Sequence, residues 1–359
     1  MDDTKLGLRR TVALEAARLL NGSLRREHPL RQLFWESTVR CNIHCRHCGS
    51  DCNMGQREPD MPLQDFLKAL DTIEEKPKGF MVVLTGGEPL LRPDIVECGR
   101  AFRQRGIGWG MVSNGFFYDE AMQEKLLSAG MGALTISLDG LEEEHNWMRG
   151  QRESFSRAVR AIGLASSVPG LAFDVVTCIS RRNIGQLPAM FNLLESLKVP
   201  QWRLFTVIPI GRAAGEADMQ LTQEESVALM EFIKEHRPGR MNVLFSCEGY
   251  LGRYEEVVRD TPFFCHAGIN IASVLVDGRI CACPDIDRDV FSQGSIYEDS
   301  LWEVWNKRFQ PFRDRSWARK GACAHCKAFR DCEGGGMHNW KGACDGPLTC
   351  IYQQITTTS

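Results

Sequence analysis

Short apolar runs alternate with amphipathic stretches along the chain from about residue 33 to residue 236. Runs such as 80–84 are continuously apolar, as strands buried on both faces of a parallel sheet require, whereas the intervening stretches repeat apolar residues at helical spacing. This alternation predicts stacked βαβ units. The expected strands are 33–39, 80–84, 109–112, 133–138, 171–179 and 202–208, and the expected helices are 61–75, 93–105, 118–129, 152–165, 184–197 and 222–236.

Six strand–helix units are fewer than the eight of a complete barrel. We therefore predict an α/β fold, a partial (β/α)6 barrel of the TIM type, with its chemistry at the carboxyl ends of the strands.

After residue 240 the pattern changes. Asp277-Gly278 separates two apolar runs, 271–276 and 279–282, as in a tight hairpin, and a short helix is expected at 301–309. The Gly- and Cys-rich tail that follows can hardly bury a core, so we expect metal to hold it together. The predicted domains are an N-terminal helical extension (1–32), a barrel (33–240) and a cysteine-rich module (241–359).

Composition narrows the class of protein. The formal net charge of -3 over 359 residues offers no basic field for nucleic acid, and no nucleic-acid-binding module is found. No run of eighteen apolar residues and no signal peptide is present, so a cytoplasmic protein without a membrane span is expected. In a reducing compartment, 15 cysteines indicate metal ligation or redox chemistry rather than disulfides.

The first cysteine group, Cys41, Cys45 and Cys48, has the spacing C-x3-C-x2-C directly after the first expected strand. Three thiolates from one loop can hold three corners of a [4Fe–4S] cluster and leave the fourth iron without a protein ligand. A zinc site completed by His44 or His47 is the alternative.

A second motif, Gly86-Gly87-Glu88-Pro89, follows the second expected strand, and the two motifs together resemble the radical S-adenosylmethionine (SAM) superfamily. The resemblance implies that Glu88 binds the SAM amino group and that the glycines let the backbone approach SAM. It also implies an external one-electron donor of the flavodoxin or ferredoxin type, and a 5′-deoxyadenosyl radical that abstracts a substrate hydrogen. His47 departs from the family, which usually has an aromatic residue there.

The resemblance extends to two further loops. Ser113 and Asn114 follow the third expected strand, where the family places polar contacts to the ribose of SAM. Ser137 and Asp139 follow the fourth strand, with Arg149 ten residues after Asp139. The resemblance implies that Ser137 and Arg149 contact the ribose and carboxylate of SAM, and a guanidinium suits a carboxylate through bidentate bonding.

The C-terminal cysteines follow the spacings C-x12-G-x4-C and C-x2-C-x5-C, with one further cysteine near the end. They resemble the SPASM domain, a C-terminal extension of radical SAM enzymes that ordinarily carries two auxiliary [4Fe–4S] clusters. The alternative is a zinc ribbon built from Cys323, Cys326, Cys332 and Cys350. The implied ligands are Cys265 and Cys283 for the inner cluster, and Cys323, Cys326, Cys332 and Cys350 for the outer cluster.

One position departs from that pattern, because Gly336 stands where the family has a further cysteine. The inner cluster then has a replacement ligand, has an open iron, or is absent, so that one or two auxiliary clusters are expected. The candidate replacements are Cys247, Cys281, Cys344, His266 and His338. The remaining thiols are interpreted as small core residues (Cys98 and Cys178) and as an off-register neighbour of the first cluster (Cys52).

Among possible functions, we expect oxidation or crosslinking of a side chain in a peptide or protein. Sulfatase maturation is an alternative, although Pro284 stands where those enzymes have an aspartate base, which leaves Asp285 as the candidate catalytic residue. A second alternative function is radical oxidation of a small molecule such as a sugar. A third is that of a non-catalytic iron–sulfur electron carrier. Arg203 and Arg212 are candidates to meet SAM or an anionic substrate, or to form surface ion pairs.

Overall fold

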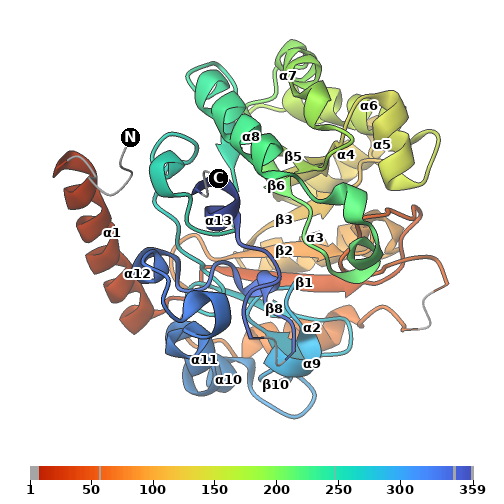
Figure 1. Ribbon diagram of the computed structural model, residues 1–359. Helices are drawn as coiled ribbons and strands as arrows, with labels where there is room; N and C mark the ends of the chain where they lie inside the picture. Colours follow the sequence, from red (N-terminus) through yellow and green to blue (C-terminus); the bar gives the residue numbers. More distant parts are fainter. Residues whose placement is uncertain (1–7, 56–57, 247, 343–344, 357–359) are drawn as a thin grey trace.

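Ten strands form a single sheet in the computed structural model, which describes residues 8–55, 58–246, 248–342 and 345–356 (Figure 1). The strand order is β10-β9-β8-β1-β2-β3-β4-β5-β6-β7, and all neighbours from β8 to β7 are parallel. The strands are β1 (Gln32–Thr38), β2 (Met81–Gly86), β3 (Gly108–Ser113), β4 (Met131–Ser137), β5 (Ala172–Ile179), β6 (Gln201–Thr206), β7 (Asn242–Phe245), β8 (Ile271–Val274), β9 (Arg279–Cys281) and β10 (Gly294–Ser295).

The helices connect these strands and cover the outer face of the curved sheet (Figure 1). The longer ones are α1 (Leu8–Glu27), α2 (Leu63–Asp71), α3 (Ile95–Gln104), α4 (Glu120–Ser128), α5 (Glu142–Arg149), α6 (Ser154–Ser166), α7 (Leu187–Ser196), α8 (Gln223–His236) and α10 (Leu301–Arg308). Short helices in the last part of the chain are α9 (Arg288–Phe291), α11 (Gln310–Arg313), α12 (Phe329–Cys332) and α13 (Ile351–Thr356). None of the helices in the described ranges has the length and apolarity needed to cross a bilayer.

The predicted α/β partial barrel is confirmed, and the six expected strands are β1 to β6. The six expected helices are α2, α3, α4, α6, α7 and α8. Within the barrel, two elements were not expected, the helix α5 and the strand β7, and in the C-terminal part the short elements α9, α11, α12, α13 and β10 were not expected either. The expected hairpin is formed by β8 and β9, but β8 also pairs in parallel with β1. The sheet therefore continues from the barrel into the C-terminal part, and the domain boundary at residue 240 stays a prediction.

The helix-facing side of the sheet forms the main core. Trp35 on β1 stacks on Phe66 of α2 with ring centres 4.2 Å apart. The Arg92 guanidinium lies 4.7 Å from the Trp35 ring centre. The Arg92 side chain is itself buried. Arg92 donates to the carbonyl oxygens of Ser37 and Met61, at 2.6 and 3.0 Å. These contacts anchor the end of β1, from which the first cysteine motif begins.

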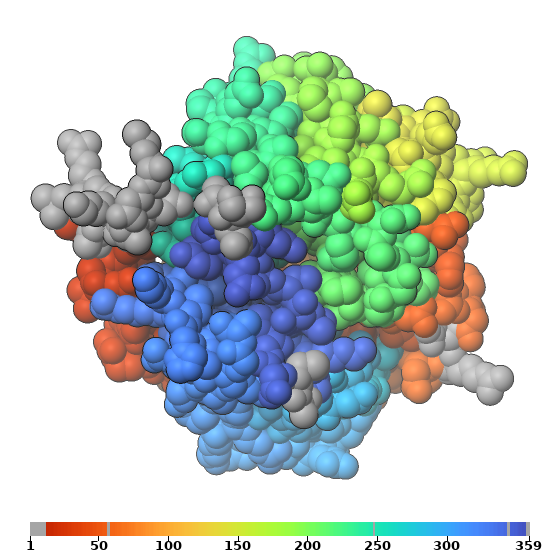
Figure 2. Space-filling model, in the orientation of Figure 1, coloured from red at the N-terminus to blue at the C-terminus, as the bar shows by residue number. Residues whose placement is uncertain are grey.

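The N-terminal helix α1 lies against the C-terminal part of the chain, next to α12 (Figure 1). Arg18 pairs with Asp331 at 2.5 Å, and Arg25 pairs with Glu333. Figure 2 shows the C-terminal segment, in blue, on the viewed face between α1 in red and the green helices of the barrel. Helix α1 and the C-terminal segment therefore lie side by side.

Candidate active site and cluster ligands

The loop after β1 brings the three thiols of the first cysteine motif together. Cys41 and Cys45 are buried with Val39 and Ile43 in a small apolar cluster, against which Cys48 packs. Burial and the nearby thiols Cys45 and Cys48 together raise the pKa of Cys41 to about 12. A bound metal would offset this effect, because it stabilises the thiolate form. The three side chains thus fit a cluster held at three corners.

Cys52 belongs to the same apolar cluster and is 2% exposed. Hydrogen bonding with Cys52 and the charge of Arg212 together lower the pKa of Cys48 to about 6. The sequence interpretation of Cys52 as a bystander therefore missed a direct contact with one expected ligand.

Arg212 braces this loop. Its Nε donates to the carbonyl oxygen of Cys45 at 2.6 Å, and its Nη1 pairs with Asp51 at 2.5 Å. The pair with the exposed Asp51 matches the ion pair that the sequence offered as one alternative, whereas the contact with the cluster loop was not anticipated. Arg203 instead pairs with Asp174 across β5 and β6, so its charge is engaged in an ion pair.

The loop after β2 lies against the end of β1. Gly87 N donates to Thr38 O at 2.7 Å, and Glu88 N donates to Arg40 O at 2.9 Å. A Cβ at Gly86 would collide with Thr38 O, and one at Gly87 would collide with Arg40 O. The glycines are therefore required for the approach of two backbone segments. Their expected approach to SAM stays a prediction.

The Glu88 carboxylate is fully buried and accepts three hydrogen bonds. The donors are Leu90 N at 3.1 Å, Ser113 Oγ at 2.9 Å and Asn114 N at 2.8 Å. Burial raises the pKa of Glu88, and these donors oppose that shift. The loops after β2 and β3 are thus joined through Glu88, with Pro89 opening a short 3-10 helix beside it. The predicted SAM contacts of these residues remain untested.

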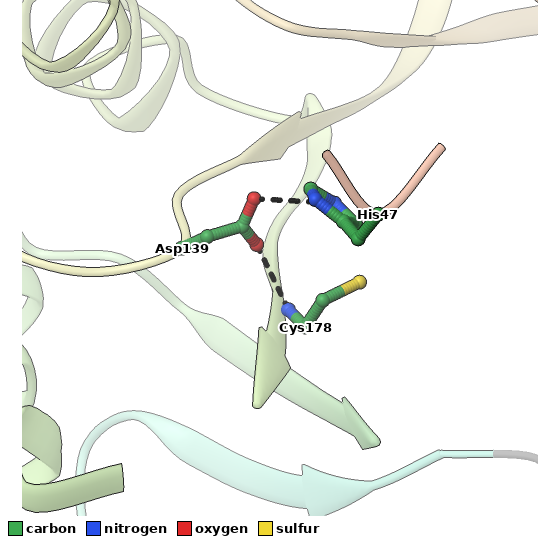
Figure 3. A group of neighbouring side chains, drawn as sticks. All are labelled: His47, Asp139 and Cys178. Atoms are coloured by element: carbon green, nitrogen blue, oxygen red, sulfur yellow. Dashed lines mark hydrogen bonds and ion pairs between the residues drawn. The ribbon is translucent and has the colours of Figure 1, made fainter. Parts of the chain in front are cut away.

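Arg149, Asp139 and His47 form a buried polar cluster beside the first cysteine motif. Arg149 Nη2 lies 2.6 Å from Asp139 Oδ2, and Arg149 Nη1 lies 3.7 Å from Cys45 Sγ. Figure 3 shows the Asp139 carboxylate between His47, whose Nε2 lies 3.5 Å away, and the backbone N of Cys178, which donates at 2.9 Å. Burial lowers the pKa of His47 to about 4. The SAM contact expected of Arg149 stays a prediction, and Cys178, interpreted from the sequence as a small core residue, lies beside this polar cluster.

Helix α5 positions Arg149. It ends at Gly150, whose φ of 65° is left-handed and where a Cβ would press on the carbonyl oxygen of His44. Arg46 N also donates to Met148 O at 2.8 Å, which ties the helix end to the cluster loop. The acidic run 142–144 and the glycine after Arg149 are helix start and stop signals that would have predicted α5.

Ser137, the other residue expected to contact SAM in this part of the chain, lies at the end of β4 and is 9% exposed. Its SAM contact stays a prediction.

The four cysteines expected to hold the outer cluster line one cavity of about 170 Å³. Burial and the nearby thiols Cys350 and Cys323 together raise the pKa of Cys332 to about 12. Four converging thiols around one hollow fit a fully ligated cluster. The lining cysteines are Cys323, Cys326, Cys332 and Cys350.

The inner site is poorer in thiols. Burial raises the pKa of Cys283 well above its usual range, and the nearby Asp285 and Cys265 raise it further. Cys281 is fully buried at the end of β9. Burial lowers the pKa of His338, and the charges of Cys265 and Asp285 oppose that shift. Of the other candidate replacement ligands, Cys247 and Cys344 lie outside the described residues.

A cleft of about 490 Å³ separates the first cysteine loop from the C-terminal part. Gly49 and Ser50 line it from the barrel, and Pro284, Asp285 and His338 line it from the other side. Its charged lining residues are mostly acidic. The carboxylates are Asp51, Glu58, Asp277, Asp285, Asp287 and Asp289, and the cations are Arg279, Arg288 and Lys341.

Comparison with known proteins agrees with this arrangement. Residues 35–194 match the Radical SAM superfamily, and residues 265–327 match an iron-sulfur cluster-binding domain, SPASM. The chain is 26% identical to an AdoMet-dependent heme synthase of Oleidesulfovibrio alaskensis (90% of this chain, 87% of that protein). It is 30% identical to the mycofactocin maturase MftC of Mycolicibacterium smegmatis (85% and 77%). The fold resembles Streptococcus suis SuiB bound to its precursor peptide SuiA, with a TM-score of 0.69 and 18% identity (93% and 79%).

These matches, with the thiols gathered after β1 and in the C-terminal part, define an iron–sulfur enzyme that uses SAM. The chain belongs to the radical SAM superfamily and carries a C-terminal SPASM domain. Its cofactors are SAM and [4Fe–4S] clusters. The interpretation as a non-catalytic electron carrier is thereby set aside.

Proposed function

We propose that this radical SAM enzyme oxidises or crosslinks a side chain of a peptide substrate that lies in the cleft of about 490 Å³. When bound, the first cluster and SAM supply a 5′-deoxyadenosyl radical that removes a hydrogen atom from the substrate. The chain's own residues shape the site: Arg212 holds the cluster loop, and Arg149 lies beside Cys45. Likeness to the mycofactocin maturase supports a peptide substrate.

The proposed substrate class rests on the charge of the residues that line the cleft. Of the six carboxylate residues in the lining, Asp51 pairs with Arg212, and Asp277 and Asp289 pair with Arg279. The acidic excess therefore comes from Glu58, Asp285 and Asp287. A heme-type tetrapyrrole carries carboxylate groups, which an acidic wall repels, so we disfavour the tetrapyrrole chemistry that likeness to heme synthases would suggest. A neutral or basic peptide is attracted instead. Formylglycine formation and sugar oxidation remain alternatives.

The test uses reconstituted enzyme with SAM and dithionite under anaerobic conditions. Candidate substrates are a short protein encoded beside this chain, a Cys-type sulfatase peptide, a carboxylated tetrapyrrole and representative sugars, each followed by mass spectrometry. We expect a loss of two hydrogens from the peptide, coupled to 5′-deoxyadenosine formation, because a positioned C–H bond captures the radical at short range. Turnover of the tetrapyrrole or a sugar alone would overturn the proposal.

Charge-matched peptides sharpen the test. Lysine-to-glutamate versions of the modified peptide should bind more weakly, and the difference should shrink as salt screens the cleft. The triple variant Cys41→Ala, Cys45→Ala and Cys48→Ala is the control, because it removes the expected ligands of the first cluster. Equal turnover of the lysine and glutamate peptides would show that the acidic lining does not select the substrate. The expected external electron donor and the cytoplasmic location stay predictions.

A further inference from the structure

The glycine at position 336 has no conformational reason to be glycine. Its φ of -66° and ψ of 145° are open to any residue. Its neighbours Gly334 and Gly335 differ, because their φ values of 82° and 77° lie in the left-handed region. A side chain at 336 is therefore excluded by its surroundings rather than by its backbone.

The excluded volume belongs to one side chain. A Cβ built on Gly336 would lie 2.5 Å from His338 Cε1, 3.0 Å from Nδ1 and 3.1 Å from Nε2. No other atom comes as near to that position. The imidazole of His338 thus occupies the space that a side chain at 336, such as the usual cysteine of the family, would fill.

The surroundings of that imidazole suit a metal ligand. His338 lines the cleft together with Asp285, on the same side as the loop that carries Cys283. Cys265 and Asp285 lie close enough for their charges to act on it. A ligating histidine commonly donates its other ring N–H to a carboxylate, and imidazole replaces thiolate in some iron–sulfur centres. Asp285 is placed to be that carboxylate.

The geometry points to His338 as a ligand of the inner auxiliary cluster, in place of the cysteine missing at Gly336 and together with Cys265 and Cys283. In this role Asp285 is a positioning residue that orients the imidazole. It is then less available as the base that formylglycine formation would need. The inference concerns the cluster and does not depend on the identity of the substrate.

The experiment starts from the full chain with Cys41, Cys45 and Cys48 replaced by Ala, so that only auxiliary clusters remain. After anaerobic reconstitution and reduction, pulsed EPR is compared between unlabelled protein and protein with 15N-histidine. We expect a histidine nitrogen coupling that changes with the label and disappears in His338→Ala. The variant His266→Ala, which removes the other candidate imidazole, should keep the coupling.

His338→Ala could lose the cluster altogether, and a second variant that exchanges the ligand position keeps the test decisive in that case. Gly336→Cys combined with His338→Ala restores the usual cysteine and removes the obstructing ring. This double variant should recover about four irons relative to His338→Ala, the content of one [4Fe–4S] cluster, without nitrogen coupling. Asp285→Asn should keep the coupling and raise the cluster's reduction potential, because it removes a nearby negative charge. Absence of coupling in the starting protein, or its persistence in His338→Ala, would overturn the assignment.

Discussion

The buried pair of Asp139 and Arg149 offers a quantitative test of the site. Their side chains are 0% and 10% exposed, and the charged atoms lie 2.6 Å apart. Removing one partner of such a pair leaves an uncompensated buried charge, which costs about 3–5 kcal/mol. Asp139→Asn is the suitable perturbation, because the amide oxygen can still accept from Cys178 N. We expect it to lower the free energy of unfolding by about 3 kcal/mol.

A double-mutant cycle isolates the charge interaction. Arg149→Met should cost a similar amount, since it leaves Asp139 buried and charged. The double variant should cost less than the sum of the two single variants by at least about 2 kcal/mol, because neither charge remains. The assay is denaturant unfolding of the reconstituted protein followed by circular dichroism, with iron content matched among the variants so that cluster binding contributes equally.

The control is Glu120→Gln, which breaks the pair of Glu120 with Arg160, whose side chains are 63% and 47% exposed. It should cost less than about 1 kcal/mol, as exposed ion pairs do. If the effects of Asp139→Asn and Arg149→Met add to within about 0.5 kcal/mol, the two charges are not coupled and the electrostatic account of this cluster is refuted.

Three further predictions concern the site and the core. Gly87→Ala should abolish 5′-deoxyadenosine formation because its Cβ collides with backbone, whereas Gly185→Ala, which meets nothing within 4 Å, should not; activity in Gly87→Ala would contradict this. Cys52→Ala should retain the iron of the first cluster and Cys48→Ala should lose it, as measured by iron content; equal losses would make Cys52 a ligand. Trp35→Ala should lower the free energy of unfolding by about 3–5 kcal/mol in denaturant titrations, and a loss below about 1 kcal/mol would refute its place in the core.

The barrel could be predicted because its signals are local. Each of β1 to β6 is an apolar run followed by an amphipathic helix, and buried parallel strands leave that pattern in the sequence. Strand β7 spans only Asn242–Phe245 and has no helix pattern after it. Its place in the sheet depends on pairing with β6, which no short-range pattern reveals.

The candidate site could be predicted as a set of residues but not as a network. Parallel strands bring their carboxyl ends to one edge of the sheet, so Glu88, Ser113 and Arg149 were expected near the first cysteine motif. That Ser113 donates to Glu88 depends on side-chain geometry. The sequence does not reveal the contact between Gly336 and the His338 ring either. A separation of two residues does not determine which space a side chain fills.

The parallel pairing of β8 with β1 has a consequence for the growing chain. Gln32 pairs with Ile271, so about 240 residues must be made before that edge of β1 finds its partner. At a synthesis rate of about 5–20 residues per second, the wait is roughly 10 to 50 s. During that time the edge of β1 presents unpaired backbone groups, which are a template for association with another chain. Ribosome-bound intermediates that lack β8 should therefore be the species most prone to aggregate, and the C-terminal module closes the barrel sheet as the last step of folding.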